Sequence, residues 1–486
     1  MKTFWAKLLL IVPLILIIAA AVIFSQFIFV PEGNAAVNVY DANVHIYDDA
    51  TGGDCTSIGT WDWPSRTCTL TTDLLFADNG LEIAGDGITL DGNGHTLTGT
   101  SNGNGVYAFG YNNVTIKNVT VTGFRIKGIA ISNATGATVI NNHVIEDYFG
   151  ILLYNSSGNT VSGNTVLASG NQAISFNINS NDNLVTNNYV RQEASYGSGI
   201  SIWASSGNLI SGNDVSSKKM FGIGVVGTNN DIRNNTASNS GAGITLGRFG
   251  QVTSGNTVAG NVITNNKYGV WFYEGTGNIV TGNTISNTVL EAVRVLYSDG
   301  NYVYNNNFLS NAIPVSIEGT SAGNIFNLAA PAGGNYWDIW TSPDTDGDGF
   351  VDNPLLFSSG QDGLPYTTAD GWCSKPTLNL GWQSVYWANI AEYNAGILTV
   401  DYTVDSLFDV YSGRIVGSVN SNGITLVTAL PLDIGDTINA GAGGSLPVTL
   451  KYQIPPGVTT FASTVYAAAD DACGNSYYYP GPPPVI

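Results

Sequence analysis

The side chains best suited to chemistry are the few charged residues and the aromatic residues that follow them along the chain. Only 11% of the 486 residues are charged. In the middle of the chain these charges gather in short turns, and each turn precedes a run of alternating apolar and polar residues. Such alternation places every second side chain on the outer face of a strand. The pattern therefore predicts a column of charges beside a column of aromatic rings.

A surface of this kind suits carbohydrate. Aromatic faces stack on sugar rings, while Arg, Lys and carboxylate groups hold hydroxyl or uronate groups. The predicted carbohydrate-binding residues are Tyr154, Arg191, Trp203, Arg248, Lys267, Trp271, Tyr273 and Arg294. The alternative interpretation is a solvated edge with scattered aromatic side chains.

Catalysis on the same surface is a second hypothesis. The candidate catalytic residues are Glu146, Asp147, Glu193, Lys218 and Lys219. Two repeats separate Glu146 from Glu193, or roughly 9.6 Å by strand spacing, which is near the upper carboxylate separation of inverting glycosidases. A lysine beside Glu193 could instead be the base of a lyase. Three functions stay open: a polysaccharide-binding protein that could also process its ligand, an active lyase, epimerase or hydrolase, and a structural or adhesive surface protein.

An acidic loop near residue 350 is a candidate metal site. Carboxylates stand at its positions 1, 3, 5 and 9 and a glycine at position 6, a spacing that suits Ca²⁺. Position 12 holds Leu355 where a full loop of this type has Glu, so the site is partial. A solvated acidic turn is the alternative. The predicted ligands are Asp344, Asp346, Asp348, the backbone carbonyl of Phe350, and Asp352.

The predicted sugar-binding and catalytic residues lie within an internal repeat between about residues 80 and 340. One asparagine recurs every 22–26 residues, at Asn118, Asn142, Asn164, Asn188, Asn213, Asn235, Asn261, Asn283 and Asn306. A small residue recurs every 21–26 residues, at Gly80, Gly105, Gly128, Gly150, Ala173, Gly199, Gly222, Gly243, Gly269 and Ala292. Two signals with one period establish a repeat.

The repeat predicts a parallel β-helix with one coil per unit. Each unit holds short alternating runs such as 199–203 and 269–273, separated by Gly, Asn and Ser, and none holds a helical pattern. Stacking in register brings identical positions roughly 4.8 Å apart. Inward asparagines then form a hydrogen-bonded ladder, and inward apolar residues such as Ile200, Ile202, Val270 and Phe272 form a continuous core.

The repeats also resemble a known family. Three features show the resemblance. They are the GN-x-x-x-x-N units, the segment GDGITLDGNGHTLTG (85–99) at the start of the repeats, and the segment GGNYWDIWTSPDTDGDGFVDNPLLF (333–357) at their end. Over roughly residues 70–370 the chain resembles the NosD-like right-handed parallel β-helix proteins, grouped with carbohydrate-binding and sugar-hydrolysing proteins. The resemblance implies an all-β, pectate-lyase-like fold of about ten coils. Such folds host many functions, so it implies no single activity.

The family name suggests a copper-related role, but we do not predict that role for this chain. The chain has three histidines, His45, His95 and His143, and two methionines. Its four cysteines fall into two pairs, which predict the disulfides Cys55–Cys68 and Cys373–Cys473 in an oxidising compartment.

The two ends of the chain differ from the repeat. An apolar run from Leu8 to Val30 behind Lys2 and Lys7 predicts an N-terminal hydrophobic helix, either a membrane anchor or a cleaved signal, and export to the cell surface or beyond. Longer alternating strands after residue 374 suggest an immunoglobulin-like β-sandwich with a Pro-rich tail.

A net charge of −20 argues against nucleic acid as a partner. The expected divisions are 1–36 signal or anchor, 37–79 N-terminal cap, 80–340 β-helix, 341–373 acidic loop and linker, and 374–486 sandwich.

Overall fold

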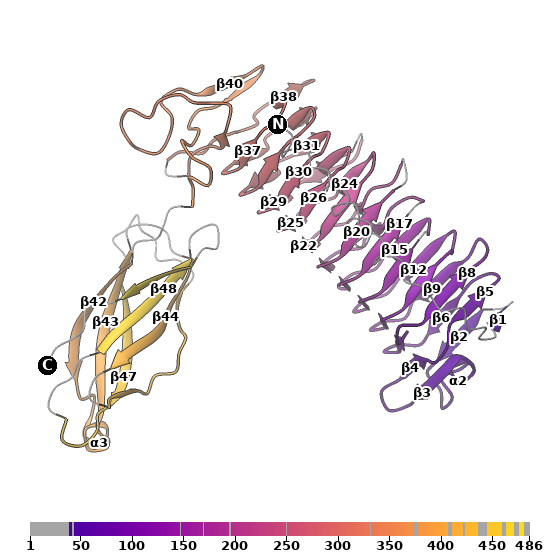
Figure 1. The fold of residues 1–486 in the computed structure, drawn as a ribbon, viewed down its shortest axis with the longest axis horizontal. Helices are drawn as coiled ribbons and strands as arrows, with labels where there is room; N and C mark the ends of the chain where they lie inside the picture. The colour runs from indigo at the N-terminus through magenta and orange to yellow at the C-terminus, as the bar shows by residue number, and fades with distance from the viewer. Residues whose placement is uncertain are drawn as a thin grey trace, which may run out of the picture. The chain divides into compact units, whose positions relative to one another are not determined.

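The computed structural model describes most of the chain from Asn38 to Pro480 (Figure 1). The predicted N-terminal helix and residues such as Glu146 and Cys473 lie outside the described residues. Within the described part, no helix has the length and apolar character needed to cross a bilayer. The described ranges are 38–40, 43–145, 147–168, 170–193, 196–248, 250–330, 332–373, 378–406, 411–420, 423–435, 445–458, 463–470 and 476–480.

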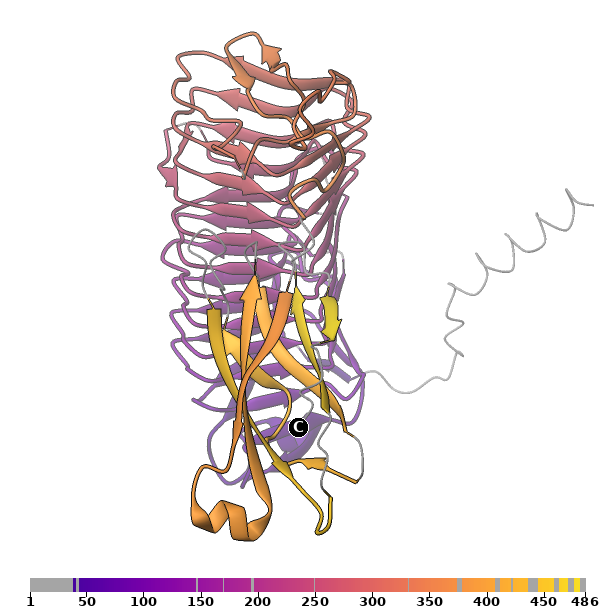
Figure 2. The same cartoon turned by 90° about the vertical axis from the view of Figure 1, so that its left-hand side faces the viewer.

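Three long parallel sheets form a β-helix, to which each full coil adds one strand per sheet (Figures 1 and 2). This confirms the predicted all-β fold. We call the sheet that carries the predicted sugar-binding strands sheet 1. Its strands are β2 (Val44–Tyr47), β6 (Leu81–Ala84), β9 (Asn104–Phe109), β12 (Lys127–Ser132), β15 (Phe149–Tyr154), β18 (Ile174–Asn177), β21 (Ile200–Trp203), β24 (Phe221–Val226), β27 (Ala242–Leu246), β31 (Tyr268–Tyr273), β35 (Glu291–Leu296) and β38 (Ile313–Glu318).

Sheets 2 and 3 complete each coil with shorter strands. Sheet 2 contains β3 (Gly59–Asp62), β4 (Thr67–Leu70), β7 (Thr89–Asp91), β10 (Thr115–Lys117), β13 (Thr138–Ile140), β16 (Thr160–Ser162), β19 (Leu184–Thr186), β22 (Leu209–Ser211), β25 (Asp231–Arg233), β29 (Thr257–Ala259), β33 (Ile279–Thr281) and β36 (Tyr302–Tyr304). Sheet 3 contains β1 (Asn38–Tyr40), β5 (Leu74–Phe76), β8 (Thr96–Gly99), β11 (Thr120–Thr122), β14 (His143–Ile145), β17 (Thr165–Ala168), β20 (Tyr189–Gln192), β23 (Asp214–Ser217), β26 (Thr236–Ser238), β30 (Val262–Thr264), β34 (Thr284–Ser286), β37 (Asn307–Leu309) and β39 (Tyr336–Trp337).

The register of sheet 1 stacks like residues on like. Ile174 pairs with Ile200, and Ile200 pairs with Ile223. Two residues further along the strand, Phe176 pairs with Ile202. These inward side chains are fully or almost fully buried and belong to one continuous core. A single coil could not exclude water from such a narrow apolar strip, so stacking is what stabilises each coil.

The asparagine ladder is confirmed from Asn142 onward. Each amide Nδ2 donates to the Oδ1 of the next asparagine at 2.9–3.0 Å, and Nδ2 groups also reach backbone carbonyls. The ladder runs through Asn142, Asn164, Asn188, Asn213, Asn235, Asn261, Asn283, Asn306 and Asn335. A second ladder, at the first Asn of each GN unit, runs through Asn159, Asn183, Asn208, Asn230, Asn256, Asn278, Asn301 and Asn324.

The prediction that Asn118 belongs to the first ladder is wrong. The Oδ1 of Asn142 accepts from the backbone of Val119, so Val119 holds the ladder position in that coil. Asn118 instead has a φ of 54°, as do the turn asparagines Asn141 (55°) and Asn187 (55°). Asparagine tolerates this left-handed conformation better than most residues. Two asparagine positions therefore lie side by side, one in the turn and one inside.

Asp362 ends the first ladder. Its Oδ2 accepts from the backbone and side chain of Asn335 at 2.8 and 3.2 Å and from the indole of Trp337 at 2.8 Å. Burial raises the pKa of Asp362 to about 6, against the lowering effect of these hydrogen bonds. Asp362 is the last residue of β41 (Gly360–Asp362), which pairs with β40 (Leu355–Phe357) in a hairpin that follows the last coil. The chain thus supplies an acceptor where no further coil offers one.

The first coils are closed by α2 (Cys55–Ile58) and the antiparallel pair β3–β4. The predicted disulfide Cys55–Cys68 is present, and it ties α2 to β4. A further small pair, β28 (Thr253–Ser254) and β32 (Gly275–Thr276), lies outside the three long sheets.

The C-terminal region forms two four-stranded sheets with a core of its own, to which Tyr402, Ile415, Leu450 and Val465 contribute. An immunoglobulin-like topology stays a prediction. Cys373 is disulfide-bonded, although its predicted partner is not among the described residues. The elements are β42 (Leu378–Tyr386), α3 (Ile390–Ala395), β43 (Ile397–Ser406), β44 (Tyr411–Asn420), β45 (Thr425–Leu426), β46 (Leu432–Gly435), β47 (Ser445–Gln453), β48 (Ser463–Asp470) and β49 (Ser476–Pro480).

Candidate functional site: a groove on sheet 1

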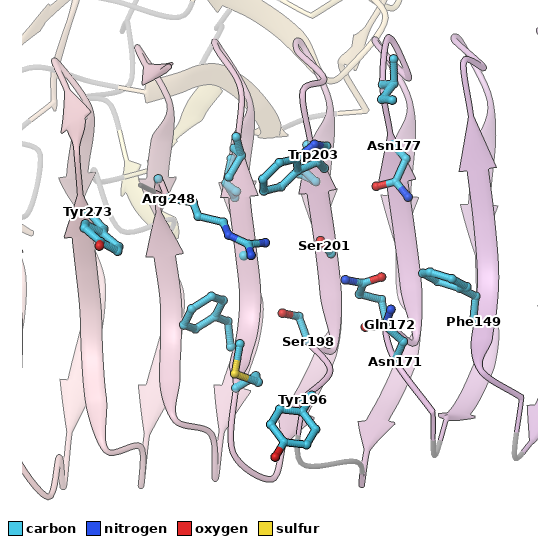
Figure 3. A pocket seen from close by; sticks show the side chains of 18 of the residues that line it. Phe149, Asn171, Gln172, Asn177, Tyr196, Ser198, Ser201, Trp203, Arg248 and Tyr273 are labelled. Atoms are coloured by element: carbon cyan, nitrogen blue, oxygen red, sulfur yellow. The ribbon is translucent and has the colours of Figure 1, made fainter. Parts of the chain in front are cut away.

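A groove of about 740 Å³ lies on the outer face of sheet 1, over the coils from β15 to β31 (Figure 3). It exists because the outward residues in the middle of β18, β21 and β24 are small. Ser175, Ser201 and Gly224 are register partners in successive coils, and larger residues, Leu152 and Thr245, precede and follow them in the same row. Ser201 and Gly224 form the floor of the groove.

The two neighbouring outward rows form the walls. One wall contains Tyr154, Asn177 and Trp203, which are also register partners. The opposite wall contains Phe149, Gln172, Ser198 and Phe221, which enter from the start of the same strands or the turns before them. Aromatic faces and amide or hydroxyl groups therefore face one another across a shallow floor (Figure 3).

An aromatic cluster closes the end of the groove nearest β31. The rings of Trp271 and Tyr273 are stacked, with centroids 5.7 Å apart and planes 9° apart. The edge of Phe221 meets Trp271 with centroids 6.2 Å apart and planes at 89°. The side chain of Thr245, which precedes Trp271 in the floor row, is almost fully buried. The cluster is therefore a fixed wall rather than a set of free side chains.

Arg248 is the only charged side chain among the described residues that line the groove. It follows β27, and its guanidinium carbon lies 5.0 Å from the ring centroid of Trp203 (Figure 3). The loop that carries it is held by two hydrogen bonds: Gln251 N–H donates to the carbonyl of Arg248 at 3.0 Å, and Gly250 N–H donates to Glu274 at 2.5 Å. These bonds hold the backbone of the loop, and the exposed Arg248 side chain extends from it over Trp203.

The structure brings five of the predicted sugar-binding residues to the groove, namely Tyr154, Trp203, Arg248, Trp271 and Tyr273. Two others lie just beyond the cluster. Arg294 donates to the Tyr268 hydroxyl at 2.9 Å and to Glu318 at 3.2 Å, and Lys267 lies 5.1 Å from the Tyr268 ring centroid.

The eighth predicted sugar-binding residue, Arg191, lies elsewhere. It belongs to β20 of sheet 3, where it is paired with Asp214 at 2.8 Å and lies over the ring of Tyr189. Hydrogen bonding and charge attraction by Asp214 raise the pKa of Arg191, although desolvation by burial is the largest single influence and acts to lower it. An arginine held in this way is a structural ion pair on another face.

The predicted catalytic residues that the structure describes do not line the groove. Asp147 is fully buried, and its carboxylate accepts the backbone N–H of Phe124 at 2.6 Å. Glu193 and Lys218 are exposed and 3.7 Å apart, and Lys219 is exposed as well. Glu146 is outside the described residues. The described lining contains no carboxylate, histidine or lysine, so what it offers is stacking and hydrogen bonding.

Several lining residues were not predicted from the sequence, including Phe149, Ser201, Phe221, Gly224 and Ile178. Aligning the coils on the inner asparagine ladder would have found the first four, because it places them in the outward rows. Ile178 stands out by conformation: its φ is 46° and its side chain is 42% exposed. A β-branched residue with positive φ is a true outlier, and such outliers concentrate at functional sites.

The acidic loop is a separate candidate metal centre. Ligand oxygens of Asp344, Asp346 and Asp348 lie within 4.8 Å of one another. Asp344 also accepts backbone N–H groups of Gly347 and Gly349 at 2.7 and 3.1 Å, which folds the loop around it. Asp352 is not part of this group, because it accepts from both the backbone and the hydroxyl of Thr345.

Two family models match the chain. Residues 190–341 match the model described as periplasmic copper-binding protein (NosD), and residues 68–215 match the right handed β-helix region. No curated protein is similar enough in sequence to count as a relative.

Solved structures resemble the chain at low identity. The Dettilon tailspike protein (gp208) is 14% identical, with a TM-score of 0.47 over 79% of this chain and 87% of its own. The A-module of the mannuronan C-5 epimerase AlgE6 from Azotobacter vinelandii is 15% identical, with a TM-score of 0.39 over 60% and 91%. An alginate lyase from a Paenibacillus species is 15% identical, with a TM-score of 0.34 over 53% and 99%. At these values the likeness carries no information about activity.

The described residues do not fit a copper centre. His45 lies 2.8 Å from Glu82, and His95 lies 3.1 Å from Asp73. His143 is half-buried, and desolvation lowers its pKa. Among the described His, Cys, Asp and Glu side chains, the three aspartates of the acidic loop form the one group close enough to share an ion. Their hard oxygen donors suit Ca²⁺ rather than copper, which prefers imidazole and sulfur.

Proposed function

We propose that this chain, a NosD-like right-handed β-helix repeat protein, binds a stretch of polysaccharide in the groove of sheet 1. The observation that carries the proposal is the groove itself, in which small floor residues on β21 and β24 lie between walls of aromatic, amide and hydroxyl groups, with lining residues from or next to six strands. Six strands at ~4.8 Å spacing span about 24 Å, enough for several sugar units end to end.

The lining favours binding over cleavage. Stacking on Trp203, Trp271 and Tyr273 would hold sugar rings, and Asn177, Gln172 and the serines would meet their hydroxyls. Cleavage needs a positioned acid or base, and the described lining holds neither a carboxylate nor a histidine. Processing by groups outside the described lining stays an alternative that product analysis tests.

We further propose that the protein acts outside the cytosol. The Cys55–Cys68 disulfide supports this location, because structural disulfides are rare in the cytosol. An attachment through the apolar N-terminal run belongs to the same proposal.

The test is a glycan screen with the purified protein, with the products checked by mass. We expect binding without chain shortening or new unsaturated ends. Gly224→Leu should abolish binding, because its side chain would rise from the floor while the core beneath stays unchanged. The double variant Trp203→Ala/Trp271→Ala should weaken binding as strongly.

The matched control is Phe109→Ala. Phe109 is 62% exposed and occupies the same outward row as Tyr154, two coils earlier, outside the groove. Binding that survives both groove variants, or no binding to any glycan, would refute the proposal. Shortened chains would make the protein an enzyme instead.

A further inference from the structure

The charge balance of the groove points to the class of glycan. The protein carries a net charge of −20, and six of the eleven Lys and Arg side chains between residues 38 and 373 have a carboxylate partner in the described part of the chain. Arg248 differs from these. No ion pair to a described carboxylate is found for it, and no carboxylate lines the groove within the described residues. What distinguishes Arg248 from the other cations without a recorded partner is its place in the lining of the groove.

One acidic side chain on the adjacent coil contacts the backbone of the Arg248 loop. Glu274, which follows β31, accepts the N–H of Gly250 from the Arg248 loop. This hydrogen bond holds the loop, and it joins one carboxylate oxygen of Glu274 to a backbone N–H group. The guanidinium therefore lies over Trp203 without a recorded carboxylate partner of its own.

The guanidinium carbon of Arg248 lies over the Trp203 ring, 5.0 Å from its centroid. A planar guanidinium that lies over an aromatic ring keeps its N–H edges available, and these edges match a carboxylate with two parallel hydrogen bonds. A neutral sugar that covered Arg248 would remove water from the cation without replacing its charge partner, which is unfavourable. A sugar with a carboxylate avoids that cost.

We infer that the groove takes an acidic polysaccharide, with a uronate carboxylate bound by Arg248 and the neighbouring sugar rings stacked on the aromatic walls. This inference rests on the proposed function, since it requires a sugar in the groove. Long-range charge would oppose such a ligand, because the whole protein is acidic. The preference for uronate is therefore a local property of one side chain.

The experiment compares each acidic chain that the glycan screen identifies with its own carboxyl-reduced form, which keeps length and linkage but removes the charge. Calorimetry gives the dissociation constants. The native protein should bind the acidic form about tenfold or more tightly than the reduced form. Arg248→Gln should lower affinity for the acidic form to about that of the reduced form, whose own affinity should stay the same or rise slightly because no cation is desolvated.

The control for net charge is Arg125→Gln, which removes one positive charge from an exposed turn outside the groove. It should keep the preference for the acidic form. Equal binding of both forms, binding of neutral chains only, or a preference that survives Arg248→Gln would overturn the inference. If the tryptophan double variant still loses binding in those cases, the proposed function stands. If the protein binds no glycan at all, both the proposed function and this inference are refuted.

Discussion

The interior of the β-helix and the outer face of sheet 1 follow opposite rules. Inside, coil after coil repeats the same residue, as Asn188, Asn213 and Asn235 do in the first ladder. Outside, register partners differ from coil to coil: Tyr154, Asn177 and Trp203 share one row, and Ser201 pairs with Gly224 in another. Identity between coils is what stacking requires, so departures from it mark the surface where the protein meets something else.

The variant Asn213→Ala tests this contrast with the largest expected change in stability. The Asn213 side chain accepts from the backbone and amide of Asn188 at 2.9 Å and donates to Asn235 and to the carbonyl of Val185, both at 2.9 Å. Alanine would leave these buried groups unpaired, so we expect a loss of about 3 kcal/mol or more in the free energy of unfolding. Denaturant unfolding measures it.

The matched control is Asn187→Gly, in the turn before the same sheet 3 strand as Asn188. Asn187 has a φ of 55°, and glycine holds the equivalent place in the next coil at Gly212. Its replacement should change stability by less than about 0.5 kcal/mol. Equal losses from the two variants would mean that the ladder does not hold the coils.

The ladder also explains how much of the fold could be predicted. A residue repeated at every coil gives many copies of one signal, which is enough to identify a β-helix and its inner face. The period alone could not distinguish Asn141 from Asn142, and Asn118 was assigned to the ladder for that reason. The backbone conformation separates the two: Asn141 in the turn has a φ of 55°, while Asn142 beside it donates to the next ladder asparagine.

The site was less predictable, for a physical reason. Alternation in a strand gives the outward direction, and it placed Tyr154, Trp203, Trp271 and Tyr273 together. Arg191 was predicted to lie in a turn before a strand of sheet 1, but it lies in β20 of sheet 3, so its side chain is on another face. The floor was missed because a small residue such as Gly224 acts by leaving space, which has no chemical signature in a sequence.

The acidic loop gives a second departure from the regular coil, with a smaller expected effect. We propose that Asp344, Asp346 and Asp348 bind Ca²⁺, because their oxygens lie close enough to repel one another without a cation. Calcium at ten times its dissociation constant should add about 1.4 kcal/mol to the free energy of unfolding. A thermal melt of the protein in calcium and in EDTA measures the change.

The control for the calcium prediction is Asp346→Asn, which removes one of the three charges and should reduce the calcium-dependent shift. Magnesium should substitute poorly, because it prefers a smaller, stricter octahedral shell. An unchanged melting temperature in EDTA would show that the loop is a solvated turn.

The smallest effect concerns one turn position at the edge of the groove. Asn155, Ile178 and Ala204 follow the register partners Tyr154, Asn177 and Trp203, and all three have positive φ. The left-handed conformation costs a branched side chain about 1–2 kcal/mol, and asparagine tolerates it. Ile178→Asn should therefore raise the free energy of unfolding by about 1 kcal/mol, measured by denaturant unfolding.

The reciprocal variant Asn155→Ile places the same strain one coil earlier, and it should lower stability by a similar amount. Ile178 lines the groove with an exposed apolar side chain, so Ile178→Asn should also weaken glycan binding while it stabilises the fold. Opposite signs for stability and binding would mean that the strain at Ile178 is kept for the ligand. A variant that stabilises the protein and binds as before would place Ile178 with the scaffold, and the functional surface would begin at Trp203.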